Sequence, residues 1–291
     1  METVITLVAP GLLDPRAVAR VVSLVGAGHA ERLSDQATDI IASGPPAELR
    51  AAAAHGLADE AVDIIAQPLA GRRKRLLISD MDSTLIGQEC IDELAAVHDL
   101  KPRVAAITER AMRGELDFAA SLTERVALLK GIPERSIAAL LAETITASPG
   151  AATMVATLKA EGVRTVLVSG GFTQFAEPIA ARLGLDAAFA NRLLIADGLL
   201  TGAVAEPILG ADAKRERLLA ECAALGIEAS DAVALGDGAN DLAMIGAAGL
   251  GLAYRAKPAV AAAADAEIRH ADLTAVLYAL GLKAGDFVVP A

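Results

Sequence analysis

The sequence contains no tryptophan, and aromatic residues make up only 2% of its 291 residues. Ala, Leu, Val and Ile must therefore build the hydrophobic core, which is typical of helices packed on a parallel sheet. No apolar run approaches the roughly 18 residues that a membrane-spanning helix needs. The N-terminal stretch also lacks a basic start and reaches Pro10 too early for a signal peptide. We expect a soluble, cytoplasmic protein with no membrane partner.

Basic residues are scarce relative to acidic ones, and the formal net charge is −11. A general nucleic-acid binder needs a basic surface, so we expect no nucleic-acid partner. The one dense basic cluster, Arg72-Arg73-Lys74-Arg75, is interpreted as a solvated linker. The two cysteines, Cys90 and Cys222, lie far apart and lack metal-ligand spacing, so a reduced compartment is the simple interpretation.

Residues 1–71 predict a small α+β domain in which strands and helices alternate. Asp14-Pro15 marks the start of the first helix, because proline is favoured in a helix's first turn. The expected strands cover residues 3–9, 37–43 and 61–69, and the expected helices cover 15–28 and 47–57. No catalytic cluster is visible in this part of the chain.

Residues 72–291 predict a larger α/β domain. Strand-like apolar runs occur at residues 76–79, 165–169, 232–236 and 250–253, and helical patterns separate the last three. This alternation indicates a doubly wound, Rossmann-like parallel sheet. The segment between the first two strands is too long for one crossover helix and carries several helical patterns, so we expect a helical cap inserted at about 88–147. Asp197-Gly198 predicts a hairpin.

Three of the predicted strands end in polar residues. The segments are Asp80-Met81-Asp82, Ser169-Gly170-Gly171 and 236–241 (GDGAND). Ligands bind beyond the carboxyl ends of strands in open parallel sheets. We therefore expect these three segments to meet in one crevice.

The expected crevice brings carboxylates together, and this needs a countercharge. Two carboxylates ~4 Å apart repel by about 4 kcal/mol at an effective dielectric constant of roughly 20. Mg²⁺ suits oxygen ligands and substrate phosphate. The residues expected around the metal are Asp80, Asp82, Asp237 and Asp241.

The second strand end and a lysine offer parts of an anion site. Ser169 carries a hydroxyl, Gly170 allows close backbone approach, and a helix is expected to begin near residue 172 or 173. Lys214, near the start of another helix, can add a cation. Each feature alone fits a turn, a loop or a surface lysine, but their combination favours phosphate chemistry. One aspartate would attack phosphorus and the other would transfer protons, since residues i and i+2 of a strand lie on the same side.

The motifs "DMDST", "SGG" and "GDGAND", with a lysine before a helix, resemble the haloacid dehalogenase-like phosphohydrolase superfamily. The stretches "DMDSTLIGQECIDELA", "FAASLTERVALLKGIP", "VSGGF", "FANRL" and "GDGANDLAMI" resemble its phosphoserine phosphatase family, over about residues 75 to 285. The resemblance implies Mg²⁺-dependent hydrolysis of O-phospho-L-serine through an aspartyl-phosphate. Asp80 would be the nucleophile and Asp82 the general acid/base. Mg²⁺ would contact the Asp80 carboxylate, the Asp82 main-chain carbonyl and Asp237, with Asp241 nearby.

The same resemblance assigns residues to the substrate. Ser169, Gly170 and Lys214 would bind the phosphoryl group, with Asn240 close to it. Glu89 would bind the substrate's amino group and Arg125 its carboxylate, while Met112 and Phe118 would form the apolar part of the cap. Independently, Phe118, Leu122, Arg125 and Leu129 share one helix face. A guanidinium on an apolar stripe needs a partner such as a carboxylate. The plainer interpretation of Arg125 is an arginine that snorkels at the edge of the stripe. The plainer interpretation of Glu89 is an acidic residue in the first turn of a helix.

Two other functions stay open. One is a related phosphatase or phosphotransferase that uses another small phosphomonoester or alcohol, such as phosphohomoserine or homoserine. The other is a non-catalytic amino-acid-binding regulatory protein in which residues 1–71 do the work. That segment resembles the ACT-like domains that some of these phosphatases carry, which implies a possible homodimer; the Asp80/Asp82 pair argues against a purely regulatory protein.

Overall fold

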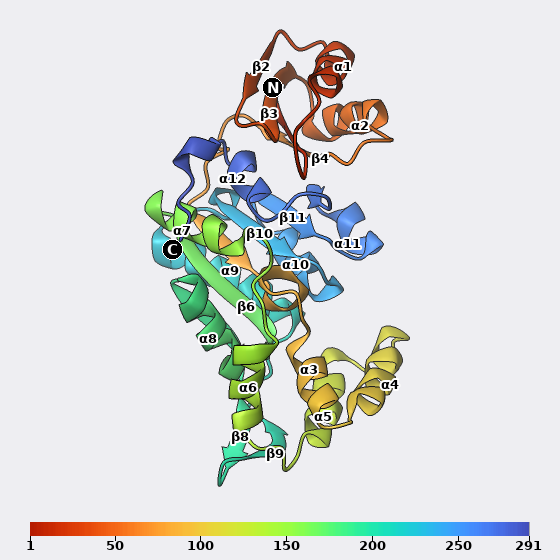
Figure 1. Cartoon of the computed structure of the whole chain (residues 1–291), viewed down its shortest axis with the longest axis vertical. Coiled ribbons are helices and arrows are strands. Elements are labelled where there is room, and N and C mark those ends of the chain that lie inside the picture. The colour runs from red at the N-terminus through yellow and green to blue at the C-terminus, as the bar shows by residue number, and fades with distance from the viewer. Residues whose placement is uncertain (291) are drawn as a thin grey trace.

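The computed structural model describes residues 1–290, apart from the side chain of Met112. Figure 1 shows three parts along the long axis: an N-terminal sheet with two helices, a central sheet flanked by helices, and helices with a hairpin at the far end. The predicted role of Met112 lies outside the described residues.

The N-terminal part is a four-stranded antiparallel sheet with the order β2-β3-β1-β4. Its strands are β1 (Glu2–Val8), β2 (His29–Arg32), β3 (Ala37–Ser43) and β4 (Asp63–Pro68), and its helices are α1 (Pro15–Val25) and α2 (Pro46–Gly56). The α+β prediction is confirmed, but strand β2 was missed. All four of its residues are exposed, so it carries no alternating apolar pattern. The ACT-like assignment stays a prediction.

Helix α1 illustrates how local sequence sets element ends. The Asp14 carboxylate accepts a hydrogen bond from the Arg16 N–H, and Pro15 occupies the first turn. Gly26 ends the helix with φ of +64°, the left-handed conformation that glycine adopts without strain. The helix therefore stops three residues before the predicted end at 28.

The N-terminal sheet is covered on both faces. Ile5, Leu7 and Ile40 pack with α1 and α2, whereas Val8 and Ile65 belong to the main core of the molecule. The interpretation of residues 72–75 as a solvated linker was wrong for two of them, as follows from their contacts. Arg72 forms an ion pair with the buried Asp39, and the buried Lys74 ammonium donates to the carbonyl oxygens of Gly71 and Ser230.

The central sheet has six parallel strands in the order β12-β11-β10-β5-β6-β7. They are β5 (Leu76–Ser79), β6 (Arg164–Phe172), β7 (Ala187–Asn191), β10 (Ala232–Gly236), β11 (Leu250–Tyr254) and β12 (Ala266–Ile268). Strands β7 and β12 were not predicted. The first is rich in alanine and the second has only three residues, so neither has a clear strand pattern.

Helices cover both faces of this sheet, as expected for a doubly wound fold. Leu77 faces a core shared with α7 (Ala151–Ala160), α8 (Thr173–Leu183) and α12 (Ala275–Ala279). Its neighbours Leu76 and Ile78 face the opposite core, with α9 (Ala211–Leu225), α10 (Leu242–Ile245) and α11 (Pro258–Ala263). The side chains of β5 thus alternate between two cores. Chain order reverses at β5, which creates a topological switch point.

Four helices lie between β5 and α7, in the segment where a cap was predicted. They are α3 (Cys90–Val97), α4 (Lys101–Met112), α5 (Phe118–Leu128) and α6 (Arg135–Glu143). Strands β8 (Leu193–Ala196) and β9 (Leu199–Val204) form the predicted hairpin, with Asp197 and Gly198 at positive φ. Backbone hydrogen bonds between Leu200 and both Gly131 and Ile132 join this hairpin to the segment that follows α5.

Short turns complete the chain. A wide turn covers Met81–Leu85, and single 3-10 turns cover Ala229–Asp231, Ala239–Asp241 and Ala284–Asp286. Within the described residues, no helix has both the length and the apolar character that crossing a membrane requires.

Candidate active site

The site lies where β5, β6 and β10 end side by side. These strands are direct neighbours in the sheet, so the three polar segments predicted to meet do meet. A cavity of about 390 Å³ opens there between the central sheet and the cap helices. Its lining includes these predicted site residues: Asp80, Asp82, Glu89, Phe118, Arg125, Ser169, Gly170, Asp237 and Asn240.

The first segment leaves the sheet in a wide turn. Strand β5 ends at Ser79, and the Ile86 N–H donates to the Met81 carbonyl oxygen to close the turn. Ser83 takes the left-handed conformation with φ of +53°. The sequence suggested that Asp80 and Asp82 lie on the same side of one strand, but both residues come after the strand ends. The backbone is nevertheless extended at both residues, and both line the cavity.

The second segment is a bulge in β6. Pairing with β7 is regular up to Val168, is interrupted at Ser169-Gly170-Gly171, and resumes at Phe172. Bulges next to active sites redirect side chains and backbone groups. The Gly171 N–H donates to the Ser169 hydroxyl oxygen at 2.8 Å. A Cβ atom at Gly170 would lie 2.8 Å from the Phe118 ring, so glycine permits the cap to approach this closely.

The third segment is a loop tied down by Asp241. One oxygen of this buried carboxylate accepts hydrogen bonds from the N–H groups of Asp237 and Gly238. Asp237 in turn accepts a hydrogen bond from the Thr84 hydroxyl at 3.1 Å. The loop after β10 is thus joined to the turn after β5.

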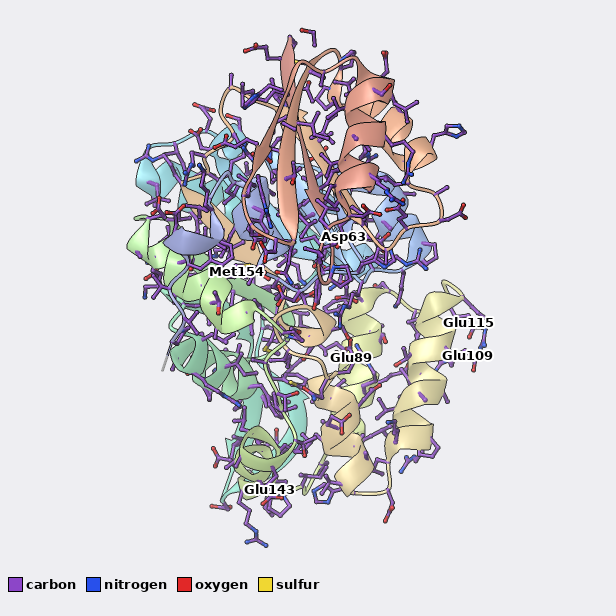
Figure 2. The ribbon with its side chains drawn as sticks, turned by 45° about the horizontal axis from the view of Figure 1, so that its top comes forward. Asp63, Glu89, Glu109, Glu115, Glu143 and Met154 are labelled. Atoms are coloured by element: carbon purple, nitrogen blue, oxygen red, sulfur yellow. The ribbon has the colours of Figure 1, made fainter. Side chains whose placement is uncertain are left out.

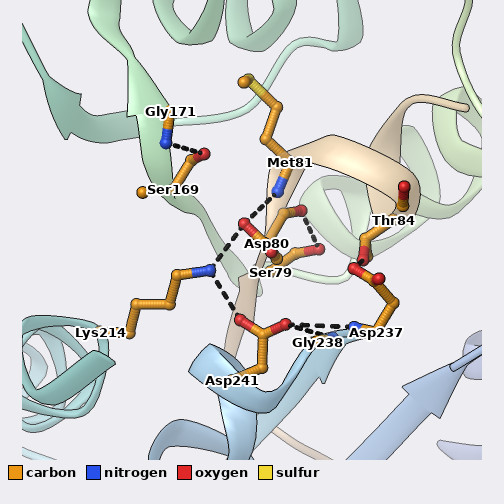
Figure 3. A network of polar contacts seen from close by, with 12 residues as sticks. Ser79, Asp80, Met81, Thr84, Ser169, Gly171, Lys214, Asp237, Gly238 and Asp241 are labelled. Atoms are coloured by element: carbon orange, nitrogen blue, oxygen red, sulfur yellow. Dashed lines mark hydrogen bonds and ion pairs between the residues drawn. The ribbon is translucent and has the colours of Figure 1, made fainter. Parts of the chain in front are cut away.

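Lys214 joins the first and third segments, as Figure 3 shows. Its ammonium nitrogen lies 2.7 Å from the Asp80 carboxylate and 2.6 Å from that of Asp241. Burial alone would lower the pKa of Lys214, but the two carboxylates outweigh this effect and raise it above its usual value. The lysine is therefore a fixed positive charge beneath Asp80.

The carboxyl groups of the site have raised pKa values. Burial and, next, Asp241 raise the pKa of Asp80 well above its usual range, although Lys214 opposes them. Burial and the charge of Glu89 raise the pKa of Asp82 to about 7. Burial, Asp241 and Glu89 raise that of Asp237 to about 6. Clustered perturbed carboxyls in a cavity are typical of a functional site.

This arrangement suits a divalent cation. Oxygen atoms of Asp80, Asp237 and Asp241 lie within 4.8 Å of one another, and carboxylate oxygens are the ligands that hard cations prefer. The Asp82 carboxylate is outside this group, and it instead accepts a hydrogen bond from the Cys90 N–H. Both oxygens of Asp241 already accept hydrogen bonds, so Asp80 and Asp237 have more free coordination capacity.

The opposite wall of the cavity belongs to the cap. Glu89 precedes α3, lies between the cap helices and the central part of the molecule in Figure 2, and accepts a hydrogen bond from the Ser83 hydroxyl. Arg125 donates only to a carbonyl oxygen of its own helix, that of Ser121, and no carboxylate pairs with it among the described residues. Arg125 lines the cavity from a half-buried position, and burial lowers the pKa of its guanidinium.

Sequence reasoning missed one charged residue of the lining, Lys257. It immediately precedes α11, and its backbone N–H donates to the Asp237 carbonyl oxygen. Its only local signal is the proline that follows it, which marks a helix start but says nothing about a cavity.

The comparisons with known sequences agree on one family. Residues 77–246 match the haloacid dehalogenase-like hydrolase family. The chain is 47% identical to phosphoserine phosphatase SerB2 of Mycobacterium tuberculosis over 231 residues, which cover 79% of this chain and 56% of that protein. It is also 47% identical to a phosphoserine phosphatase of Idiomarina loihiensis over 215 residues, which cover 74% of this chain and 96% of that protein.

Solved structures give the same result. A HAD family hydrolase from Salmonella enterica serovar Typhi superposes with a TM-score of 0.87 at 30% identity, covering 96% of this chain and 98% of that one. A phospho-aspartyl intermediate analogue of a phosphoserine phosphatase has a TM-score of 0.66 at 42% identity, covering 71% of this chain and 98% of that one. The central sheet and its helices thus have the fold expected from the motifs.

Proposed function

Because the chain belongs to the family of haloacid dehalogenase-like hydrolases, we propose that it is a Mg²⁺-dependent phosphatase that hydrolyses O-phospho-L-serine to L-serine and phosphate. Two of the relatives named above, of which this chain covers 96% and 98%, are named phosphoserine phosphatases. The chain spans only 56% of the length of the mycobacterial relative.

One observation carries the substrate assignment: the cap contributes two side chains of opposite charge, Glu89 and Arg125, to the cavity wall opposite the strand ends. Glu89 and Arg125 line the same cavity as Asp80 and Ser169. A carboxylate suits an ammonium group, and an unpaired guanidinium suits a carboxylate through two parallel hydrogen bonds. Together with the anion site, they match an amino acid that carries a phosphate ester. Phe118 closes the cavity against Gly170 and excludes larger substrates.

The chemistry takes two steps. In the first, the Asp80 carboxylate attacks phosphorus and the bond to the serine oxygen breaks, while Asp82 donates a proton to that oxygen. With a pKa of about 7, Asp82 holds a transferable proton near neutral pH. In the second, Asp82 takes a proton from water while the oxygen of that water attacks phosphorus; the bond between phosphorus and the Asp80 oxygen breaks, which frees the Asp80 carboxylate and releases phosphate. Lys214, Ser169 and the Gly170 backbone hold the phosphoryl oxygens.

For the metal, we assign ligands to this chain's residues without further geometry. The Asp80 carboxylate, the Asp82 main-chain carbonyl and Asp237 would hold Mg²⁺, and Asp241 would support them by fixing Lys214 and the Asp237 loop. When bound, Mg²⁺ neutralises the negative charge of the carboxylates and the phosphoryl oxygens.

A phosphate-release assay tests this function. With O-phospho-L-serine and Mg²⁺ we expect turnover, and with excess chelator we expect its loss and recovery when Mg²⁺ is added back. Asp80→Asn keeps the shape of the side chain but removes the nucleophile, and we expect turnover at least about 10³-fold lower. Near-normal activity of Asp80→Asn, or release unaffected by chelator, would refute the assignment.

Two further points need separate measurements: whether water or an alcohol accepts the phosphoryl group, and whether the chain forms a homodimer. Product analysis with added homoserine distinguishes hydrolysis from phosphoryl transfer, and we expect free phosphate to account for all product. A cytoplasmic location and a homodimer stay predictions, and light scattering in solution tests the dimer.

A further inference from the structure

Asn191 is a buried carboxamide next to the site that has no role in the chemistry above. It lies at the end of β7, in the "FANRL" stretch, and only 3% of its surface is exposed. Its Nδ2 donates to the carbonyl oxygens of Gly170, at 2.9 Å, and Leu209, at 3.1 Å. Its Oδ1 accepts from the Leu209 N–H at 2.7 Å. All three contacts are to backbone groups of two different segments.

The contact to Gly170 fixes a peptide plane in the phosphate-binding bulge. The carbonyl of Gly170 and the N–H of Gly171 belong to the same peptide, and in a trans peptide they point in opposite directions. Asn191 holds the carbonyl on its own side, so the N–H points to the other side, where it donates to the Ser169 hydroxyl oxygen. Glycine on both sides of a peptide leaves it unusually free to rotate, so this orientation depends on outside contacts.

The orientation of this peptide decides what the cavity presents to an anion. Because the Ser169 oxygen accepts from Gly171, the hydroxyl's own hydrogen is free to donate to a phosphoryl oxygen. If the peptide rotated, the Gly170 carbonyl oxygen would turn towards the cavity that Gly170 and Ser169 line. A negative end of a dipole would then face negative oxygens, which opposes the stabilisation that such sites supply.

The hydrogen bonds between Asn191 and Leu209 connect Asn191 to the start of α9, the helix that carries Lys214. Leu209 precedes Gly210, whose carbonyl oxygen accepts from the Lys214 N–H in the first turn of α9. One side chain thus joins the bulge that carries Ser169 to the start of the helix that carries Lys214.

We propose that Asn191 is a positioning residue for phosphoryl binding: it prevents the Gly170–Gly171 peptide from rotating and sets the start of α9 relative to the bulge. The inference rests on the proposed function, because it assumes that Ser169 and Gly170 bind a phosphoryl group.

A purely structural role would give a different result, and the chain contains a matched control. Gln174, at the start of α8, uses its carboxamide in the same way: it donates to the Leu193 carbonyl oxygen and accepts from the Leu193 N–H. Among the described residues, Gln174 makes no hydrogen bond to Gly170 or Leu209. Replacing Gln174 by alanine therefore removes a comparable pair of hydrogen bonds to the backbone but leaves the hydrogen bonds to Gly170 and Leu209 in place.

The test compares Asn191→Ala with Gln174→Ala. Turnover of O-phospho-L-serine is measured per folded molecule, together with competitive inhibition by inorganic phosphate in the presence of Mg²⁺. For Asn191→Ala we expect kcat/KM to fall about 10- to 100-fold, since small misplacement of binding groups has this effect, and the inhibition constant for phosphate to rise. For Gln174→Ala we expect both within about two-fold of the unsubstituted chain. Equal effects of the two substitutions would overturn the proposal.

A second variant covers the case in which alanine prevents folding. Asn191→Asp keeps the shape and the acceptor for the Leu209 N–H, but a carboxylate cannot donate to Gly170. We expect weakened phosphate inhibition and a crystal structure in which the Gly170 carbonyl has rotated towards the cavity. Unchanged phosphate inhibition with an unrotated peptide would overturn the proposal.

A failure of the proposal for Asn191 can be distinguished from a failure of the proposed function. If the unsubstituted chain releases no phosphate from O-phospho-L-serine, the substrate assignment fails. Binding of inorganic phosphate, followed by calorimetry in the same three variants, still decides whether Asn191 positions the anion site.

Discussion

Arg125 is the residue whose loss should separate substrate recognition from phosphate chemistry. It faces the cavity without a carboxylate partner among the described residues. A charge-assisted hydrogen bond contributes about 1.5–3 kcal/mol, so we expect Arg125→Ala to lower kcat/KM for O-phospho-L-serine by roughly 10- to 100-fold. Phenyl phosphate has no carboxylate, and its hydrolysis should change only a few-fold. Steady-state kinetics on both substrates measures the difference.

Another cap arginine provides the control for that experiment. Arg110 is already paired with Glu124 at 2.7 Å and does not line the cavity. Arg110→Ala should therefore leave the preference between the two substrates unchanged. If Arg125→Ala lowered both substrates by the same factor, the carboxylate contact would have to be abandoned.

Lys257 is expected to attract the substrate rather than to react with it. It is exposed, lines the cavity, and has no carboxylate partner among the described residues. Phosphoserine is anionic and the chain carries −11, so a local positive charge should raise the association rate. We expect Lys257→Gln to lower kcat/KM several-fold, with little change in kcat, and to weaken its dependence on salt.

The control for Lys257 is a lysine of equal charge away from the cavity. Lys130, exposed just after α5, is not among the lining residues. Lys130→Gln should leave kcat/KM and its salt dependence unchanged. The same response from both lysines would mean that only net charge matters.

At the scale of single residues, the site residues that belong to dense local motifs could be predicted from the sequence. Asp80, Asp82 and Asp237 follow strands, and Ser169 is the last residue of a predicted strand. Because the ends of these strands meet, their positions could be inferred from the strand pattern alone. Lys257 and Asn191 could not be found this way. Their surroundings come from β6, β10 and the loop before α9, which are distant in sequence.

At the scale of elements, prediction succeeded where one pattern dominated and failed where an element was short or polar. Strand β10 was predicted with its observed bounds because its five residues form a short run without polar side chains, and the structure buries all five. Strand β6 was predicted to end at residue 169, but it continues to Phe172 through the bulge. The two glycines of the bulge suppress a strand prediction, and only pairing with β7 restores it.

The pairing of β6 with β7 depends on a carboxylate, and this leads to a prediction about pH. Asp186, just before β7, accepts hydrogen bonds from the Thr165 N–H and hydroxyl and pairs with Lys159. Burial alone would raise the pKa of Asp186, but the Thr165 N–H and Lys159 outweigh it and lower the pKa. The stabilisation is therefore fully present above the unfolded-state pKa of about 3.9 and is lost as pH falls through the lower folded-state pKa.

Asp186→Asn should reveal this contribution. We expect a free energy of unfolding lower by about 1–2 kcal/mol at pH 7, and a smaller difference from the unsubstituted chain near pH 2. Urea denaturation at both pH values measures it. Asp59→Asn changes an exposed carboxylate and serves as the control. A deficit for Asp186→Asn that stayed constant with pH would contradict the assigned cause.

At the scale of the whole molecule, the N-terminal sheet is fixed to the central one by polar contacts as well as by packing. Figure 2 shows Asp63 at the junction of the two parts. Its carboxylate accepts hydrogen bonds from three consecutive N–H groups after β12, those of Arg269, His270 and Ala271. Gln67 donates to the carbonyl oxygen of Ala279 in α12. Such contacts join segments some 200 positions apart, which is why the sequence suggested two independent units and a solvated linker.

Arg72 is the centre of this junction and its removal should uncouple the two parts. The guanidinium binds Asp39 through two nitrogens, at 2.5 and 2.9 Å, and donates to the carbonyl oxygens of Tyr278 and Ala279. Arg72→Ala would leave the Asp39 carboxylate buried without its partner, which costs about 3–5 kcal/mol. We expect calorimetry to show one unfolding transition for the unsubstituted chain and two for Arg72→Ala, with turnover per folded molecule unchanged. Arg73→Ala, which breaks an exposed pair, should cost less than about 1 kcal/mol; an equal loss from both would show that the junction does not depend on the buried pair.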